Sequence, residues 1–205
     1  MMKLWYSTTS AFARKVLTVM KHHHLEDKIE LQRVSVAADP NSPHNQDNPL
    51  GRIPALQRNC GNWLFGSLLI CEYLDYKGKD AKLFPEAGKA RWAALALHNL
   101  ADGISENTTP MVTEKKFRPE NEWWTSRYAQ VAERNARSFA QMEQAIQPFS
   151  YELNIGTLTA VCLIDWWAFR QAFLGYDLAV HHPALVKWAA EMNARYPELS
   201  ETMYK

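Results

Sequence analysis

A hydroxyl-rich segment precedes the first helical pattern of the chain. Ser7, Thr8, Thr9 and Ser10 come directly before apolar residues that recur at helical spacing from Phe12 onward. Serine is favoured at a helix N-cap, because its side-chain oxygen accepts a backbone N–H that the helix leaves unpaired. A hydroxyl at the positive end of a helix can also contact an anion. The residues alone favour a cap at Ser10 and leave anion contact open.

Three further residues could contact a ligand. Pro54 follows Ile53, and because an ordinary X–Pro bond is cis in only about 5% of cases, the proline alone predicts no special geometry. We expect Ser67 to cap the helical stretch that follows it, where it could also meet an anion at the helix N-terminus. Arg52 could pair with a carboxylate, although a solvated loop arginine explains it equally well.

Histidine and cysteine patterns argue against metal and disulfide chemistry. His22, His23 and His24 are adjacent, and adjacent residues of a helix point in different directions. We therefore expect no metal ion and interpret the three as the end of the first helix. The three cysteines form no CxxC pair, and an odd, sparse set indicates a reducing cytoplasm rather than a secreted protein.

The first part of the chain alternates strands and helices. The predicted strands are 3–6, 29–34, 53–56 and 63–65, and the predicted helices are 11 to 21–23 and 68–76. Residues 37–52 are rich in Asp, Asn, Pro and Ser and predict an irregular connection.

Everything after residue 89 has helical periodicity. The predicted helices are 90–114, with a bend expected near Gly103 or Pro110, then 120–146, 157–173 and a shorter one after Pro183. Residues 79–89 carry glycine, proline and several lysines and predict a linker. We therefore expect an α/β domain over 1–78 and an all-helical domain over 90–205.

Composition narrows the function classes. Of the 205 residues 47% are hydrophobic and the formal net charge is +1, so the chain can bury a core and lacks the concentrated positive charge of a nucleic-acid or membrane-surface binder. No apolar run approaches the roughly 18 residues of a membrane span, and the N-terminus lacks the apolar core of a signal peptide. We expect a soluble cytoplasmic protein that binds small molecules or other proteins.

Three segments together resemble the glutathione transferase family. They are Asn48 to Leu56, similar to the family's loop and cis-proline segment, Phe65 to Leu74, similar to its strand-to-helix glutathione-binding turn, and Ser7 to Val16, like the first helix of bacterial serine-type members. The helical second part of the chain also resembles the family, from Leu100 to Glu120. The resemblance implies a thioredoxin-like N-terminal domain with a mixed four-stranded sheet, an all-helical C-terminal domain and a homodimer.

The resemblance also implies a reaction and a site. Glutathione would be a co-substrate whose thiolate attacks an electrophilic small molecule, as in detoxification, and no metal is needed. A hydroxyl hydrogen bond contributes roughly 1.5 to 3 kcal/mol to such an anion, and the helix end adds about 0.3 to 1 kcal/mol. Ser10 would hold the sulfur, with Thr9 and Tyr6 as alternatives. Tyr6 is otherwise expected to pack beside Trp5.

The remaining implied roles concern the tripeptide and the second substrate. Glutathione would be bound by Arg52, Ile53, cis-Pro54, Gly66 and Ser67. The second-substrate pocket would lie between the domains, with one wall from Phe12 and another from Met111, although each is more often simply core.

Three departures from the family pattern stand out. Gly66 replaces an acidic residue before the serine of the turn, Ala11 replaces a proline after the catalytic position, and Ala160 replaces the acidic end of a capping box that begins at Thr157. The first weakens the expected glutathione site. Two alternatives therefore stay open, a non-catalytic binding or regulatory protein and a glutathione-dependent reductase or dehalogenase.

Overall fold

The computed structural model describes residues 1–34 and 39–205. The chain forms two compact units, the first from residues 1–85 together with 196–205 and the second from residues 86–195. The predicted domains, 1–78 and 90–205 with a linker at 79–89, stay a prediction.

The first unit is built on a four-stranded mixed sheet. Its strands are β1 (Met2–Tyr6), β2 (Ile29–Arg33), β3 (Ala55–Gln57) and β4 (Trp63–Phe65), in the spatial order β2-β1-β3-β4. β1 pairs in parallel with β2, whereas β3 is antiparallel to both β1 and β4. The mixed four-stranded sheet predicted for a thioredoxin-like domain is confirmed.

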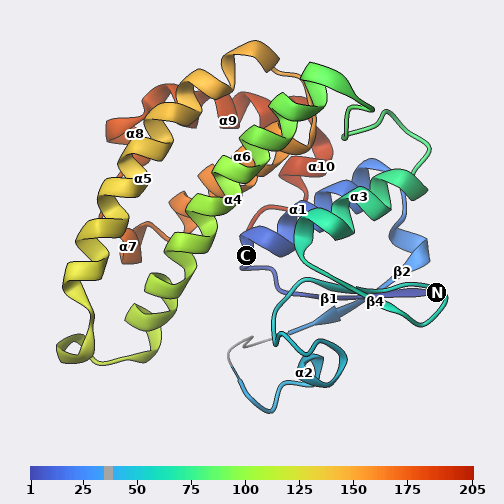
Figure 1. Ribbon diagram of the computed structural model, residues 1–205, viewed down its shortest axis with the longest axis horizontal. Coiled ribbons are helices and arrows are strands. Elements are labelled where there is room, and N and C mark those ends of the chain that lie inside the picture. Colours follow the sequence, from blue (N-terminus) through green and yellow to red (C-terminus); the bar gives the residue numbers. More distant parts are fainter. Residues whose placement is uncertain (35–38) are drawn as a thin grey trace. The chain divides into compact units, whose positions relative to one another are not determined.

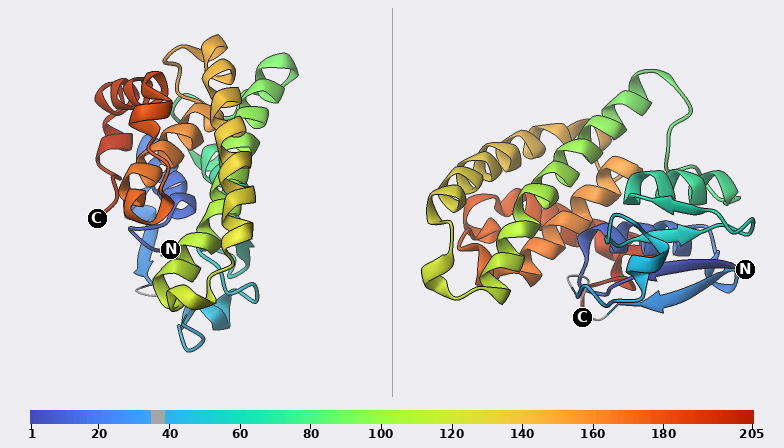
Figure 2. Two further views of the ribbon diagram at one scale, coloured as in Figure 1. Left: turned by 90° about the vertical axis from the view of Figure 1, so that its left-hand side faces the viewer. Right: turned by 60° about the horizontal axis from the view of Figure 1, so that its bottom comes forward.

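Both faces of this sheet are covered. The helices α1 (Ala11–His22) and α3 (Ser67–Lys77) lie on one face, and the short helix α2 (His44–Asp47) lies on the other (Figures 1 and 2). Because side chains alternate along a strand, Leu4 and Leu56 pack on one side of the sheet while Trp5 and Ala55 pack on the other. The remaining elements of this unit are η1 (Glu26–Lys28) and α10 (Pro197–Ser200).

The second unit is helical. Its longer helices are α4 (Gly88–Phe117), α5 (Thr125–Ala145), α6 (Ile155–Phe169) and α9 (Pro183–Arg195), and its short ones are η2 (Glu120–Glu122), η3 (Gln147–Phe149), α7 (Gln171–Leu174) and α8 (Leu178–His181). Aromatic rings fill its core, where Phe139 meets Trp167 edge to face with 4.8 Å between ring centroids. The Trp188 indole N–H donates to the Ser150 carbonyl at 2.7 Å.

Most predicted elements are confirmed, with differences at helix ends. α4 continues through Gly103 and Pro110 as one helix, α6 begins at Ile155 instead of Thr157, and the predicted helix to Phe173 is divided into α6 and α7. The irregular connection predicted for 37–52 contains α2, and its residues 37 and 38 lie outside the described residues. Sequence periodicity cannot reveal helices as short as α2, α8 and α10 because they span about one turn.

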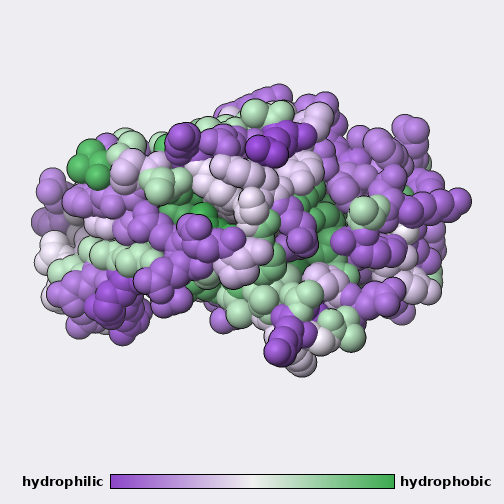
Figure 3. All heavy atoms as spheres, turned by 90° about the horizontal axis from the view of Figure 1, so that it is seen from above, coloured by the Kyte–Doolittle hydropathy of each residue, from purple (hydrophilic) through white to green (hydrophobic). Residues whose placement is uncertain are grey.

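Large apolar side chains reach the surface at scattered positions. Figure 3 shows one face on which hydrophilic side chains predominate and hydrophobic ones reach the surface in places. The exposed large apolar side chains include Leu50, Tyr76, Trp92 and Trp124. Across residues 1–34 and 39–205, every helix is too short or too polar to cross a bilayer.

Candidate functional site

Strand pairing gathers the predicted ligand contacts of the first unit at one edge of the sheet. Trp5 pairs with Ala55, and Ala55 pairs with Phe65. The end of β1, the start of β3 and the end of β4 therefore lie side by side, because β3 runs antiparallel to both neighbours. The segments that leave the sheet at this edge are 7–10, 51–54 and 66–67, which carry Ser10, Arg52, Ile53, Pro54, Gly66 and Ser67.

Ser10 is the N-cap of α1. Its backbone is extended, with φ −97° and ψ 123°, and its Oγ accepts a hydrogen bond from the Ala13 N–H at 3.2 Å. Its carbonyl oxygen accepts from the Arg14 N–H at 3.0 Å. The cap predicted from the sequence is confirmed, and these two bonds fix the Ser10 side chain relative to the first turn of the helix.

The cap leaves the Ser10 hydroxyl proton unused. A serine hydroxyl has one proton to donate and two lone pairs that accept. The bond from Ala13 occupies a lone pair, and within the described residues the hydroxyl donates to no acceptor. A half-buried hydroxyl proton at the positive end of a helix can therefore be donated to an anion.

The neighbouring hydroxyls differ from that of Ser10. Thr9 Oγ1 lies 3.0 Å from Ser7 Oγ, and the Thr9 N–H donates to the same Ser7 oxygen at 3.2 Å. The two side chains thus form a small local network, which stabilises the loop between β1 and α1. Ser10 stands outside this network, although which hydroxyl meets a ligand stays a prediction.

Tyr6 lies on the other face of the sheet from Trp5, so the expectation that the two aromatic rings pack together is wrong. Successive strand residues point to opposite faces. The Trp5 indole N–H donates to Asp47 Oδ2 of α2 at 2.7 Å. Tyr6 instead lines a cavity of about 160 Å³ with α1 residues, including Leu17, and with the C-terminal Met203.

The loop before β3 is braced from within. Asn48 Nδ2 donates to the Arg52 carbonyl at 2.6 Å, and Asn48 Oδ1 accepts the Leu50 N–H at 3.0 Å. Asn48 is 1% exposed, so these bonds are shielded from water. The Ile53–Pro54 peptide bond is cis, as expected from the resemblance. Arg52 is exposed and free to reach a ligand.

α3 begins differently from the sequence prediction. Gly66, not Ser67, is the N-cap, with φ 89° and ψ 128°, a backbone conformation that L side chains rarely adopt. Ser67 is the first helical residue, and its hydroxyl makes no hydrogen bond within the part of the chain that the structure describes. The glycine that replaces the family's acidic residue thus takes the conformation of the turn without strain. The hydroxyl and first N–H groups of α3 remain available to an anion.

Phe12 and Met111 belong to different units. Phe12 is half-buried in the first turn of α1, and the Lys15 ammonium lies 5.4 Å from its ring centroid. Met111 is 8% exposed within α4. Their predicted role in one second-substrate pocket stays a prediction.

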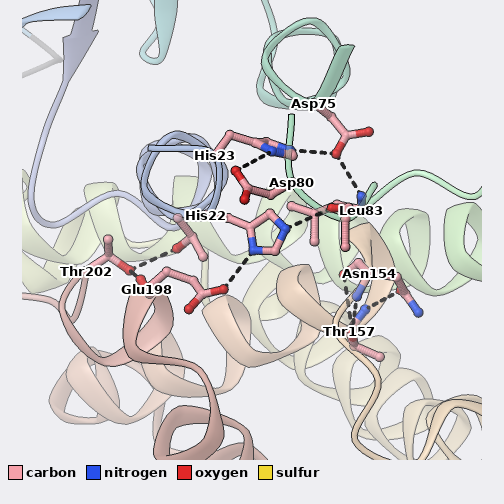
Figure 4. Close-up of polar contacts among 11 residues, drawn as sticks. His22, His23, Asp75, Asp80, Leu83, Asn154, Thr157, Glu198 and Thr202 are labelled. Atoms are coloured by element: carbon pink, nitrogen blue, oxygen red, sulfur yellow. Dashed lines mark hydrogen bonds and ion pairs between the residues drawn. The ribbon is translucent and has the colours of Figure 1, made fainter. Parts of the chain in front are cut away.

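The adjacent histidines end α1 as predicted, and they make separate polar contacts in the first unit (Figure 4). His22 Nδ1 lies 2.8 Å from Glu198 Oε1, and His23 Nε2 lies 2.9 Å from Asp75 Oδ1. Gly78 permits this close packing, because a Cβ there would lie 2.1 Å from the His23 ring. Residues 1–34 and 39–205 contain no cluster of three His, Cys, Asp or Glu side chains that could hold a metal ion.

Asp75 is the buried acceptor of this region. Burial alone would raise the pKa of its carboxyl group. The His23 hydrogen bond and the backbone N–H groups of Leu83, at 2.7 Å, and Phe84, at 3.4 Å, outweigh burial and hold the pKa below its usual value. Asp75 therefore joins the C-terminal end of α1 to the segment after α3.

The second unit contains a capping box that begins at Asn154, one turn before the Thr157 expected from the sequence. Asn154 is the N-cap of α6, and its Oδ1 accepts the Gly156 and Thr157 N–H groups at 2.9 and 3.1 Å. Thr157 Oγ1 accepts the Asn154 N–H at 2.9 Å. Thr157 is thus the third helical residue, and the loss of an acid at Ala160 does not break the box.

Known proteins resemble the chain over its whole length. Residues 9–77 match the sequence model of the glutathione S-transferase N-terminal domain. A crystal structure of a glutathione transferase family member from Pseudomonas fluorescens Pf-5, with bound glutathione, is 29% identical, covers 100% of both chains and has a TM-score of 0.91.

Two further relatives agree with this match. A glutathione S-transferase from Methylobacillus flagellatus KT, solved with glutathione bound, is 27% identical over 100% of both chains, with a TM-score of 0.83. The uncharacterized GST-like protein YibF of Escherichia coli (strain K12) is 26% identical over 203 residues, 95% of each chain.

Proposed function

We propose that this chain, a member of the glutathione S-transferase family by its N-terminal domain and its fold, binds glutathione and stabilises its thiolate for attack on an electrophilic small molecule. The observation that carries the proposal is the unused Ser10 hydroxyl proton at the N-terminus of α1. It lies at the sheet edge that also carries the loop before β3 and the start of α3.

The proposed reaction needs a sulfur anion. A free thiol has a pKa of about 8.5, so only a few per cent is ionised at neutral pH. Donation from Ser10 would stabilise the thiolate by roughly 1.5 to 3 kcal/mol, and the helix end would add up to about 1 kcal/mol. Together these contributions lower the thiol pKa toward neutrality, with no separate base required.

The tripeptide would be held by complementary groups at the same edge. The Ile53 N–H and C=O, which pair with no group among the described residues, would bind the cysteinyl peptide as an added strand binds a sheet edge. Ser67 and the first N–H groups of α3 would bind the γ-glutamyl carboxylate. The exposed Arg52 would pair with the glycine carboxylate. Phe12, half-buried in the first turn of α1, would contact the electrophile.

Retention on immobilised glutathione and a conjugation assay with a generic aryl halide test this function. A Ser10→Ala variant that loses conjugation while Tyr6→Phe keeps it supports Ser10 as the thiolate donor. The opposite pattern moves the role to Tyr6, and loss in a Thr9→Val variant alone moves it to Thr9. Product analysis separates transfer from reductase or dehalogenase chemistry.

A non-catalytic binding or regulatory protein is the second candidate, and Gly66 favours it. The glycine offers no carboxylate to the ammonium group of glutathione. Titration calorimetry with millimolar glutathione discriminates between the two, since the absence of heat with glutathione and with its conjugates favours the second candidate.

Assembly and location complete the proposal. The protein forms a homodimer, as the resemblance implies, and sedimentation that shows only a 23.6 kDa species contradicts this. It acts in the cytoplasm, where the cysteines Cys60, Cys71 and Cys162 remain thiols, as they are in the structure. Cell fractionation tests the location.

A further inference from the structure

The C-terminal segment, residues 196–205, belongs to the first unit and lies along α1. Figure 1 shows α10 beside that helix. The segment reaches back to the beginning of the chain, where the Thr8 hydroxyl donates to the Lys205 carbonyl at a long 3.4 Å. Its course therefore follows α1 toward the end that carries Ser10.

The contacts recur along one face of α1. Thr18 Oγ1 lies 2.9 Å from Thr202 Oγ1, Lys21 Nζ lies 2.6 Å from Glu201 Oε2, and His22 meets Glu198 at 2.8 Å (Figure 4 shows the last of these). Side chains about one turn apart share a helix face, so the segment is aligned with the helix rather than touching it at one point.

Among the α1 residues that contact the segment, Arg14 is the nearest to Ser10 along the chain, and it is buried. The residue is 1% exposed, and its Nη2 donates to the Leu199 carbonyl at 3.0 Å and to Met203 Sδ at 3.2 Å. The Tyr204 ring lies over the guanidinium, with 4.9 Å between Cζ and the ring centroid. A buried charge is costly unless it is bonded, and these three contacts tie the Arg14 guanidinium to the segment.

Arg14 is joined to Ser10 through the helix backbone. Its N–H donates to the Ser10 carbonyl at 3.0 Å, and the preceding Ala13 N–H donates to Ser10 Oγ at 3.2 Å. The Arg14 backbone and the Ser10 cap therefore belong to the same hydrogen-bonded turn. Catalytic groups must be held to within about 0.5 Å, and a 1 Å error can reduce the rate about a hundredfold.

Packing between the segment and the sheet is incomplete around Met203. A cavity of about 160 Å³ lies beneath it, lined in part by Tyr6, Leu17, Leu31 and Met203. The segment is held by the fully buried Leu199 and by the polar contacts of Arg14 and Thr18.

We infer that Arg14 is a positioning residue, and that residues 203–205 fix the Ser10 hydroxyl at the thiolate site by holding the Arg14 guanidinium. This inference rests on the proposed function for its consequence in catalysis. The geometric part, that the segment rigidifies the first turn of α1, concerns the ligand-free protein and can be tested without glutathione.

Hydrogen–deuterium exchange of the ligand-free protein tests the geometric part. A variant that ends at Thr202 lacks Met203 and Tyr204, and we expect the amides of Ala13 and Arg14 to exchange at least tenfold faster in it. Amides of β3 serve as the internal reference and should not change. Tyr204→Leu, which keeps the chain length, should give an increase of the same sign if the shortened chain does not fold.

Glu201→Gln is the matched control. It weakens the exposed contact of the same segment with Lys21 at the far end of α1, so the Ala13 and Arg14 amides should exchange as in the wild type. Equal exchange in the wild type, the shortened chain and Tyr204→Leu would overturn the inference.

The thiolate pKa of bound glutathione tests the catalytic part. We expect it to rise by about one unit in the shortened chain, with kcat falling at pH 7 and recovering at higher pH, while KM for glutathione changes less than threefold. A lower melting temperature with an unchanged thiolate pKa would reduce Arg14 to a purely structural role. If the wild type does not lower the thiol pKa, the proposed function fails, whereas the exchange result still decides the geometric part.

Discussion

Ser10 caps α1 and Asn154 caps α6, and the two caps differ in how many of their hydrogen-bonding groups are paired within the protein. Ser10 accepts one N–H, from Ala13, and keeps a proton that is donated to nothing among the described residues. Asn154 accepts two N–H groups, and its own N–H is accepted by Thr157. The Thr157 hydroxyl in turn donates to the Glu152 carbonyl at 2.7 Å.

The two capping residues also differ in their exposure to solvent. Asn154 is 1% exposed, whereas Ser10 is half-buried. A cap whose donors and acceptors are all paired inside the protein stabilises the fold and has nothing left for a ligand. A cap with an unpaired proton near solvent stabilises the helix less and can contact an anion. The comparison predicts that substitutions at the start of α6 lower the free energy of unfolding, whereas a substitution at Ser10 mainly lowers the rate of glutathione conjugation.

Gly156, in the first turn of α6, should show the largest stability effect. A Cβ at this position would lie 2.4 Å from the Ala94 carbonyl oxygen and 3.0 Å from Leu97 Cβ, and a backbone oxygen cannot move away cheaply. Gly156→Ala should lower the free energy of unfolding by about 3 kcal/mol, measured by denaturant unfolding. Gly103→Ala is the control, because a Cβ there meets nothing within 4 Å. Since alanine favours a helix more than glycine does, this variant should raise the free energy of unfolding by about 1 kcal/mol.

Ser10→Ala should reduce kcat/KM for glutathione conjugation between about tenfold and a hundredfold, the equivalent of about 1.4 to 2.7 kcal/mol, because the sulfur anion loses its donor. The free energy of unfolding should fall by only about 1 kcal/mol. Steady-state kinetics and denaturant unfolding of the same preparation compare the two effects. A loss of stability that exceeds the loss of activity would make Ser10 a structural cap like Asn154.

Asn154→Ala should show the opposite pattern. Losing the acceptor leaves the buried Gly156 and Thr157 N–H groups unpaired, so the free energy of unfolding should fall by about 2 kcal/mol. The activity of the folded fraction should remain within twofold of the wild type. Asn154→Asp keeps the acceptor and should retain most of the stability. Loss of activity in the alanine variant at full folding would contradict the division of roles.

The far end of α1 gives the smallest effect, through Asp75. Its folded-state pKa lies below the unfolded value of about 3.9. The stabilisation is therefore fully present above pH 4 and is lost as the pH falls through the folded-state pKa. Unfolding curves between pH 3 and 7 should show a steeper loss of stability for the wild type than for Asp75→Asn. Parallel curves would mean that Asp75 does not contribute.

Local sequence patterns predicted the elements well and their exact starts less well. Periodicity placed α1 and β2 because their apolar residues are regularly spaced. It misplaced the caps of α3 and α6, because the choice of cap depends on backbone angles. Gly66 caps α3 through its positive φ, and Asn154 caps α6 by turning its side chain toward Thr157.

Long-range contacts could not be predicted from local pattern. The burial of Arg14 depends on Leu199, Met203 and Tyr204, which lie at the other end of the chain. Nothing in the sequence around Arg14 distinguishes it from a solvated helix arginine. The candidate site itself was found by its resemblance to a family, while the pairing of β1, β3 and β4 supplies the physical reason why its segments lie together.

The most direct test of the central claim is a pH titration of the glutathione thiolate by ultraviolet absorbance, on the wild type and on Ser10→Ala. The account predicts a thiol pKa at least one unit below the ordinary value of about 8.5 in the wild-type complex. It predicts a return toward that value when the Ser10 hydroxyl is removed. Identical titration curves for the two proteins would contradict it.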